Sequence, residues 1–242
     1  MENLVIVTGS SQGLGKALVE LFCSEKHNRV IGLSRSGLNY DSTNFSDLKI
    51  DLSDFEEVKT NLANIFPKGD FENITLINNA GWIGEIAHFG DLSAEAITKI
   101  HLINTIAPAV LMNEFVKSYK DNPAIKTVVN ISSGAAEKNI DGWSGYSSSK
   151  AAVNRYTEIA QEESDMNKWE IKFYALSPGI IDTGMQKDIR SAKPNGFSRL
   201  EAFKGFKENK ELATPEEVAE KVKFLIDNRD DFKSVMQDVR QF

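Results

Sequence analysis

Short apolar runs rich in β-branched residues alternate along this chain with longer segments in which apolar positions recur every three or four residues. The short runs predict buried strands, and the longer segments predict helices that bury one face. Strands are expected at residues 4–7, 29–33, 47–50, 75–78, 127–131 and 170–176, with helices near 16–22, 54–66, 93–119, 145–163 and 215–227. Because strands that alternate with helices are joined by right-handed crossovers, the pattern predicts an α/β fold around a parallel sheet.

One long segment, from about residue 184 to residue 212, interrupts this alternation. It contains Pro194, Gly196, Gly205, three phenylalanines and many charges. An irregular segment of this length beside a cleft is typical of a mobile cover, so a substrate lid is expected here. No repeat, low-complexity tract or Pro/Gly-rich linker divides the rest of the chain, and 242 residues with 41% apolar content suit one α/β domain. We therefore expect a single domain over residues 1–242.

Composition and charge narrow the class of ligand. The formal net charge of −7 argues against nucleic acid or an anionic membrane, because such partners require clustered Lys and Arg. No segment reaches the roughly 18 to 20 apolar residues of a membrane span, and the first residues lack the basic start of a secretory signal. We expect a cytoplasmic protein with a small-molecule ligand. Cys23, the only cysteine, is expected to pack on a helix, and His27, His88 and His101 show no metal-ligand spacing.

A glycine-rich turn joins the first strand to the first helix, in the order Thr8-Gly9-Ser10-Ser11-Gln12-Gly13-Leu14-Gly15. Glycines let the backbone approach a pyrophosphate closely, and the free N–H groups at the helix N-terminus meet its charge. The turn therefore indicates a dinucleotide site. A purely structural turn is the alternative.

Tyr146 and Lys150 lie four residues apart in the run Gly145-Tyr146-Ser147-Ser148-Ser149-Lys150. On a helix these two residues share a face, so the Lys150 ammonium can lie beneath the phenol and stabilise its ionised form. A cation about 4 Å away, at an effective dielectric near 20, contributes roughly 4 kcal/mol, or about three pKa units. The spacing therefore predicts that Tyr146 acts as a proton donor.

Several ordered motifs together resemble the short-chain dehydrogenase/reductase family over essentially the whole chain. They are the glycine turn, Asp51-Leu52, Asn78-Asn79-Ala80-Gly81, Asn104, Ser133 thirteen residues before Tyr146, and Pro178-Gly179-Ile180-Ile181-Asp182-Thr183. Each motif alone is weak or moderate, but their joint order is specific. The resemblance implies a single-domain Rossmann fold, which is a doubly wound parallel sheet with helices on both faces.

The resemblance also implies roles for individual residues. A carbonyl that accepts hydride becomes alkoxide-like, so it needs hydrogen-bond donors and an acid, which Ser133 and Tyr146 can provide. Lys150 would also hold the ribose, and Asn104 would hold a water in a proton relay; a helix asparagine that bonds its neighbours is the alternative. The implied cofactor-binding residues are Gly9, Ser11, Gly13, Leu14, Gly15, Ser34, Arg35, Asp51, Asn79, Ala80, Gly81, Tyr146, Lys150, Pro178, Gly179, Ile181 and Thr183.

The end of the second strand indicates which nicotinamide cofactor is used. An NAD enzyme usually has an Asp or Glu there for the ribose 2′-OH, whereas a 2′-phosphate requires Arg and small hydroxyls. This chain has Ser34 and Arg35 and no acid, which favours NADPH; an ordinary surface arginine is the alternative. Gln12 departs from many NADP-dependent relatives, which carry a basic residue at that position.

Two shorter motifs resemble the branch that contains sepiapterin reductase and the bacterial benzil reductases that form (S)-benzoin. They are Gly142-Trp143-x-x-Tyr146 and Asp182-Thr183-Gly184-Met185-Gln186. This likeness implies an NADPH-dependent reductase of one carbonyl of an α-dicarbonyl such as benzil. A pterin or other small ketone or aldehyde reductase is the alternative, for which Asp238 is the nearest candidate carboxylate. A non-catalytic NADP-binding regulatory protein is the alternative of another class.

The same branch suggests residues for substrate and for assembly. Trp82, Trp143, Met185 and Gln186 are the substrate candidates, and Phe197, Phe203 and Phe206 could complete an aromatic pocket, although ordinary core packing is the alternative. The long helical segments 93–119 and 145–163 carry apolar faces through which relatives pair, so a homodimer is expected.

Overall fold

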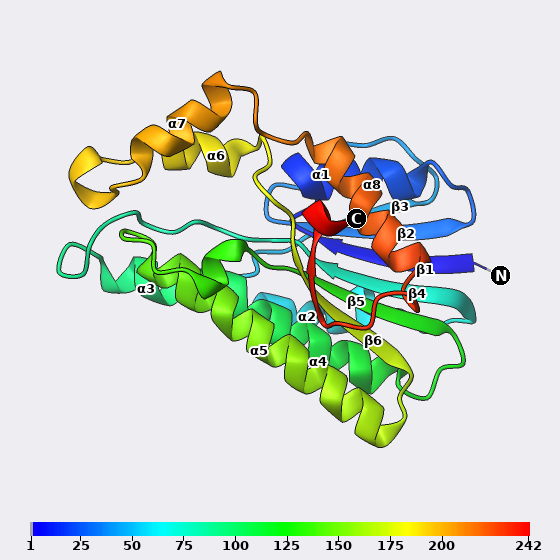
Figure 1. Ribbon diagram of the computed structural model, residues 1–242. Coiled ribbons are helices and arrows are strands. Elements are labelled where there is room, and N and C mark those ends of the chain that lie inside the picture. The colour runs from blue at the N-terminus through cyan, green and yellow to red at the C-terminus, as the bar shows by residue number, and fades with distance from the viewer. Residues whose placement is uncertain (1) are drawn as a thin grey trace.

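A computed structural model describes residues 2–242 and places seven parallel strands at the centre, in the order β3-β2-β1-β4-β5-β6-β7 (Figure 1). The strands are β1 (Glu2–Thr8), β2 (Asn28–Ser34), β3 (Phe45–Lys49), β4 (Phe71–Asn78), β5 (Ile125–Ile131), β6 (Ile171–Ser177) and β7 (Met236–Asp238). Six of them were predicted. The seventh is only three residues long, which is too short to produce a recognisable alternation.

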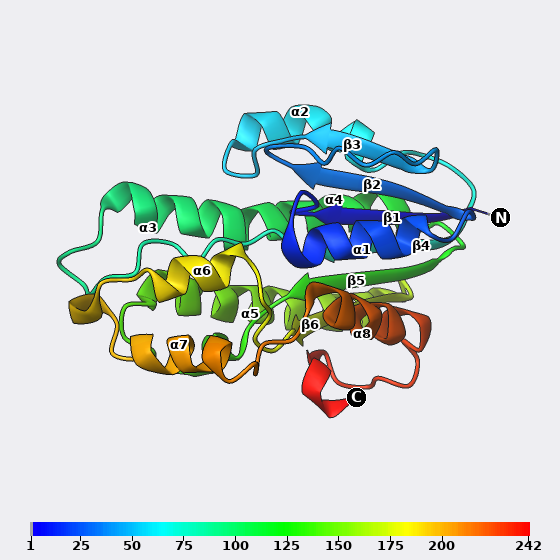
Figure 2. The same cartoon turned by 90° about the horizontal axis from the view of Figure 1, so that it is seen from above.

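Helices cover both faces of this sheet, as Figures 1 and 2 show. One face is covered by α1 (Gly13–Cys23) and α8 (Pro215–Asp227), which pack against each other and share one apolar cluster with the sheet. The opposite face is covered by α2 (Phe55–Ile65), α4 (Ala107–Tyr119) and α5 (Ser144–Asn167). The doubly wound single-domain Rossmann fold is confirmed. Among the described residues, no helix is long and apolar enough to cross a membrane.

Local sequence sets the helix boundaries. The Asp54 side chain accepts hydrogen bonds from two N–H groups in the first turn of α2. Before α8, Thr214 and Glu217 form a reciprocal capping box, and Pro215 occupies the first helical position, where no N–H is needed. These caps satisfy backbone donors that the helix itself leaves unpaired.

The long helix expected over residues 93–119 is interrupted by a wider turn. The structure has α3 (Ala94–His101), then a π-helical turn (Leu102–Ile106), then α4. An unbroken α-helix would pair the carbonyl of Asn104 with the N–H of residue 108, but Pro108 has none. Instead, the Ala107 N–H donates a hydrogen bond to the Leu102 carbonyl five residues earlier, which is the spacing of a π-helix. This turn carries Asn104.

The carboxyl ends of β1 and β4 form the central edge of the sheet. From β1 the chain crosses to β2 on one side, whereas β4 is followed by β5 on the other, so a crevice opens between them. The Thr8 hydroxyl accepts from the N–H groups of Asn79 (3.0 Å) and Ala80 (2.9 Å) and ties the two strand ends together. The glycine turn and the 78–81 motif therefore meet here.

The segment 184–212, called the cap below, lies beyond this carboxyl edge in both views (Figures 1 and 2). It folds as α6 (Gly184–Arg190), a 3₁₀ turn (Pro194–Gly196) and α7 (Leu200–Glu208). Its base is held by parallel pairing of Ile181 with Ala213. That the cap moves with substrate stays a prediction.

Candidate active site

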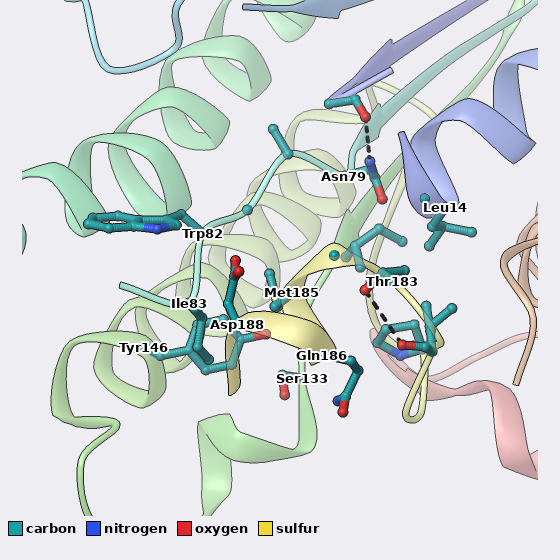
Figure 3. A pocket seen from close by; sticks show the side chains of 18 of the residues that line it. Leu14, Asn79, Trp82, Ile83, Ser133, Tyr146, Thr183, Met185, Gln186 and Asp188 are labelled. Atoms are coloured by element: carbon teal, nitrogen blue, oxygen red, sulfur yellow. Dashed lines mark hydrogen bonds between the residues drawn. The ribbon is translucent and has the colours of Figure 1, made fainter. Parts of the chain in front are cut away.

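One cavity of about 780 Å³ opens at the carboxyl edge of the sheet. Every predicted cofactor and substrate residue lines it except Gly15, together with Ser133, Tyr146 and Lys150. Figure 3 shows Leu14, Asn79 and Thr183 toward one end of the cavity, and Tyr146, Ser133, Asp188 and Gln186 grouped apart from them. The cavity therefore joins a dinucleotide-sized half to a second half beneath the cap.

The glycine turn fits close to its neighbours. Gly9 and Gly13 have φ of +69° and +54°, a region that favours glycine. A Cβ on Gly15 would lie 2.1 Å from the Gly9 carbonyl oxygen, so no side chain fits there. Gly15 does not line the cavity; it brings α1 against the turn that does. No side chain caps α1, which leaves its first N–H groups available at the cavity.

Tyr146 and Ser133 lie together in the half of the cavity beneath the cap. Tyr146 is 7% exposed, and the Ser133 hydroxyl lies close enough to its phenol to lower the pKa of the phenol. Ser132, the neighbouring candidate, is buried and donates instead to Asn154 Oδ1 in the interior. The thirteen-residue spacing therefore selects the serine that meets the tyrosine.

Burial dominates the protonation of this pair. Burial raises the pKa of Tyr146, and the hydrogen bond with Ser133 opposes part of that rise. Burial lowers the pKa of Lys150 to about 8. Its Nζ donates to the Ile131 carbonyl oxygen at 2.7 Å and lies 5.9 Å from the centre of the Tyr146 ring. The lowering of the Tyr146 pKa that we expected from Lys150 is not found, because a dry site disfavours both charged forms.

Asn104 lies behind the cavity wall and is fully buried. Its Nδ2 donates to the Trp82 carbonyl (2.8 Å) and to the Ser149 hydroxyl (3.1 Å), and its Oδ1 accepts from Trp82 N–H (2.9 Å). A Cβ on Gly81 would lie 3.6 Å from Lys150 Nζ and 3.8 Å from Asn104 Oδ1, so these two groups flank one glycine. In this structure Asn104 fixes the loop that carries Trp82.

The far end of the dinucleotide half contains Ser34, Arg35 and Asp51. Ser34 is buried and its hydroxyl accepts from Gly37 N–H, whereas Arg35 is exposed. The Asp51 carboxylate accepts from the Ser53 N–H (2.9 Å) and hydroxyl (2.7 Å). Burial would raise the pKa of Asp51, but these bonds and the nearby Arg35 outweigh burial and lower it. This end is therefore charged, with one guanidinium directed at the surface.

Aromatic rings build the half beneath the cap. Trp143 stacks on Phe197 with ring centres 5.4 Å apart and planes within 10°, and it meets Tyr146 edge-on at 5.5 Å. Phe203 contacts Trp143 and Phe206. Phe203 and Phe206 line the cavity, but Phe197 does not; it lies behind Trp143 as backing. The predicted aromatic cluster exists, with Phe197 as its support.

Trp82 sits at the edge of the cavity, and Figure 3 shows its ring extending away from Met185 and Gln186. The Lys99 ammonium lies 5.6 Å over that ring. Trp82 and Met185 both pack against the apolar cluster that contains Trp143, so these three substrate candidates border one apolar region.

Sequence reasoning missed several residues that line the substrate half: Ile83, Ile140, Asp188 and Arg199. Asp188 follows Gln186 by two residues on α6, so the short helix could have suggested it. Nothing in the sequence distinguishes Arg199 from other surface arginines. In residues 2–242, no cluster of His, Cys, Asp or Glu side chains is placed to hold a metal ion.

A family model described as short chain dehydrogenase matches residues 3–194. The chain belongs to the short-chain dehydrogenase family. Members of this family bind nicotinamide cofactors, and this short-chain dehydrogenase is an oxidoreductase that acts on CH–OH or C=O groups.

Individual relatives agree with this membership. Benzil reductase ((S)-benzoin forming) of Bacillus subtilis (strain 168) is 34% identical over 220 residues, which cover 90% of each chain. Sepiapterin reductase of Xenopus laevis is 29% identical over 202 residues, covering 76% of this chain and 75% of that one. The crystal structure of a short chain dehydrogenase/reductase from Saccharomyces cerevisiae has a TM-score of 0.81 at 24% identity, covering 98% of this chain and 96% of that one.

The lowered pKa of Lys150 predicts how this short-chain dehydrogenase binds its cofactor as pH changes. The ammonium is charged below about pH 8 and loses its proton as pH rises through that value, well before an ordinary lysine would. If it donates to the cofactor ribose, affinity should be full below about pH 8 and weaken above it. Fluorescence titration of NADPH from about pH 6 to about pH 10 measures this, with Lys150→Arg as a permanently charged control. Affinity that stays constant to about pH 10 in the unmodified enzyme would contradict it.

Proposed function

We propose that this enzyme transfers hydride from NADPH to one carbonyl of an α-dicarbonyl substrate, as in the reduction of benzil to (S)-benzoin. The observation that carries the proposal is that the Ser133 and Tyr146 hydroxyls lie near each other on the wall of a cavity that also contains the dinucleotide half. The similarity to a bacterial benzil reductase supports the substrate class.

A nicotinamide dinucleotide fits the residues present. The uncapped N-terminus of α1 and the close glycine turn suit a pyrophosphate, and Asp51 lies where the resemblance expects the adenine. Thr183 and the turn at Gly179, which has φ of +72°, also line the cavity, and the resemblance assigns them to the carboxamide. When bound, the reduced cofactor supplies the hydride.

The side chains of this chain then complete the reaction. The Ser133 and Tyr146 hydroxyls donate hydrogen bonds to the substrate carbonyl oxygen, where negative charge develops. Tyr146 gives its proton to that oxygen, and its raised pKa keeps the phenol protonated until then. The Lys150 ammonium stabilises the Tyr146 phenolate that remains. The Asn104 amide holds the loop that carries Trp82. The aromatic wall excludes water from the transfer.

NADPH is favoured over NADH by the charges at the far end of the cavity. The guanidinium of Arg35 is exposed there and forms no hydrogen bond with the described residues, beside the small Ser34 and Ser36 side chains. No carboxylate of residues 34–36 competes for the ribose 2′ position. A planar guanidinium suits a phosphate through charge-assisted bonds.

Two buried polar atoms support a substrate with a second polar group. Trp143 Nε1 and Gln186 Oε1 have no hydrogen-bond partner among the described residues, although both side chains are more than nine-tenths buried and both residues line the cavity. Buried polar groups of this kind are normally satisfied by protein, water or ligand. The carbonyl that is not reduced, or the hydroxyl formed beside it, would supply such a partner.

A pterin reductase is the second candidate. The carboxylate expected for it, Asp238, pairs with Arg240 and does not line the cavity. Asp188 does line it, and a carboxylate there could hold a pterin amino group. The non-catalytic alternative is disfavoured, because a pure binding protein needs no Ser133–Tyr146 pair.

The reaction is tested by NADPH oxidation at about 340 nm with benzil, 1-phenyl-1,2-propanedione, the matched mono-ketone propiophenone, and sepiapterin, with product chirality measured.

Tyr146→Phe keeps the ring but removes the donor, so turnover should fall by two or more orders of magnitude while NADPH still binds. Tyr40→Phe, which removes a hydroxyl outside the cavity, is the control. Near wild-type turnover by Tyr146→Phe would remove it from the mechanism, and a preference for the mono-ketone or for sepiapterin would reject the dicarbonyl assignment.

Cofactor choice is tested at Arg35. Its contact with the 2′-phosphate should contribute roughly 1.5 to 3 kcal/mol, so Arg35→Ala should lose about ten- to a hundred-fold in preference for NADPH over NADH. Arg35→Lys should lose less of this preference for NADPH, because lysine keeps the positive charge but not the planar, bidentate donors of the guanidinium. The comparison is made on kcat/KM for the two cofactors. Equal use of both by the unmodified enzyme would reject the assignment.

We also propose a homodimer paired through α3, α4 and α5. Exposed apolar side chains lie on α3, on the π-turn that leads into α4 and on α5: Ile97, Ile106, Tyr156, Ile159 and Met166. Light scattering at micromolar concentration should give the mass of two chains, and Ile159→Glu should halve it, because a charge would be buried at the interface. Phe55→Glu, an equally exposed position on α2, should leave the mass unchanged. A monomeric unmodified protein would refute the dimer.

A further inference from the structure

Three consecutive residues just before the catalytic tyrosine contact three consecutive residues at the tip of the cap. Asp141, Gly142 and Trp143 precede α5, and Gly196, Phe197 and Ser198 lie between α6 and α7. We call this six-residue contact the clasp. It joins two segments that are more than fifty positions apart in the sequence.

The first element of the clasp is a carboxylate with three partners. Asp141 accepts from the Ser198 N–H (2.8 Å) and hydroxyl (2.6 Å), and His88 Nε2 lies 3.3 Å from it. The two bonds from Ser198, and then His88, lower the pKa of Asp141 to about 2. The carboxylate is therefore ionised at neutral pH, and its hydrogen bonds to the cap are charge-assisted there.

The second element is a close approach of two backbones. Gly142 has φ of +74°, and a Cβ there would lie 2.2 Å from the Gly196 carbonyl oxygen. On its other side, a Cβ on Gly196 would lie 3.3 Å from the Ile86 carbonyl oxygen. Because both positions are glycine, the cap tip fits between the loop that contains Gly142 and the loop that contains Ile86.

The third element of the clasp is an aromatic contact with Tyr146. Trp143 stacks on Phe197 of the cap and meets the ring of Tyr146 edge-on, so one indole touches both the cap tip and the proton donor. Phe203, farther along the cap, contacts the same indole.

Along its length the cap packs apolar side chains, among them Ile189 and Leu200, in one cluster with Ile83 and Tyr146, and polar contacts hold its base. There Ala213 N–H donates to the Ile180 carbonyl, Asp182 N–H donates to Ala213, and Lys207 pairs with Asp182. Figure 1 shows the 3₁₀ turn and the start of α7 reaching away from this base, over the loop before α3 and the start of α5. The cap is therefore held by its base, by this apolar packing and by the clasp, and the clasp contributes the hydrogen bonds at the cap tip.

We propose that the clasp holds the cap in its substrate-binding position, so that Asp141 and Ser198 are positioning residues that set KM for the carbonyl substrate. Neither lines the cavity, so neither touches substrate or cofactor. Without the clasp the cap populates other positions, and apparent affinity falls by the fraction of time that the binding position is lost. Saturating substrate restores that position, so kcat is preserved.

The test measures kcat, KM and NADPH affinity for Asp141→Ala, Ser198→Ala and the double variant. Each single change should raise KM about tenfold with kcat and NADPH affinity changed less than about twofold, and the double variant should be no worse than Asp141→Ala, since both act on one contact. Asp141→Asn keeps one acceptor oxygen and should lie between Asp141→Ala and the unmodified enzyme. Ser191→Ala removes an equivalent hydroxyl whose bond stays within the end of α6, and should leave KM unchanged.

Hydrogen exchange supplies a readout that needs no substrate. Peptides covering residues 194–206 should exchange faster in Asp141→Ala and Ser198→Ala than in the unmodified protein and Ser191→Ala, while the strands stay protected. Unchanged exchange, or a fall in kcat with KM unchanged, would overturn the proposal. The proposal depends on the reductase activity only for its kinetic arm, where any carbonyl compound that the enzyme reduces will serve. A wrong α-dicarbonyl assignment would change the substrate used and leave the exchange result standing.

Discussion

The site depends on one topological constraint, which is that the chain leaves β1 and β4 toward opposite sides of the sheet. Two neighbouring parallel strands then end beside each other with no crossover between them, and their backbone groups face an open crevice. The Thr8 hydroxyl joins the two strand ends, and the absence of a side chain at Gly15 lets α1 begin against the turn. These short contacts fix the position of the glycine turn at the mouth of the crevice. The turn is open to a ligand there because the two chain crossovers leave in opposite directions.

Burial sets the chemistry of Tyr146 and Lys150 as much as their spacing does. The four-residue spacing places both side chains on one face of α5, but that face packs on the sheet, and a dry site disfavours a phenolate and an ammonium alike. The ammonium finds a partner in the Ile131 carbonyl at the end of β5. This arrangement suits the proton-donor role that we propose for Tyr146, since such a donor must remain protonated until charge develops on the substrate oxygen.

The sequence predicted the fold well where a pattern is long. Six strands and the main helices follow from apolar periodicity, whereas β7 is too short to show any. The π-turn at Asn104 was missed because a period of 3.6 residues hides a single widened turn, although Pro108 gives a local reason for it. Motif order located every predicted cofactor residue on the cavity wall except Gly15, but it did not find lining residues such as Ile50, Lys99 and Ile103. It could not show that Phe197 supports Trp143 from behind or that Asp188 and Arg199 face the cavity, because those facts depend on how the cap folds back.

The two halves of the cavity are constrained differently. For this reason the residues of the dinucleotide half were easier to predict from the sequence than those of the substrate half. The dinucleotide half is built from strand ends and backbone, where a glycine or a short motif has one workable geometry. The substrate half is built from side chains on a cap that pairs with the sheet at its base, packs apolar side chains against the body and is hydrogen bonded to the segment before α5 at its tip. Many sequences could fill such a cap, provided that something fixes its position over Tyr146. That requirement falls on Gly142 and Asp141, which adjoin Trp143 in the chain, so the residues that place the cap are also those that begin the catalytic helix.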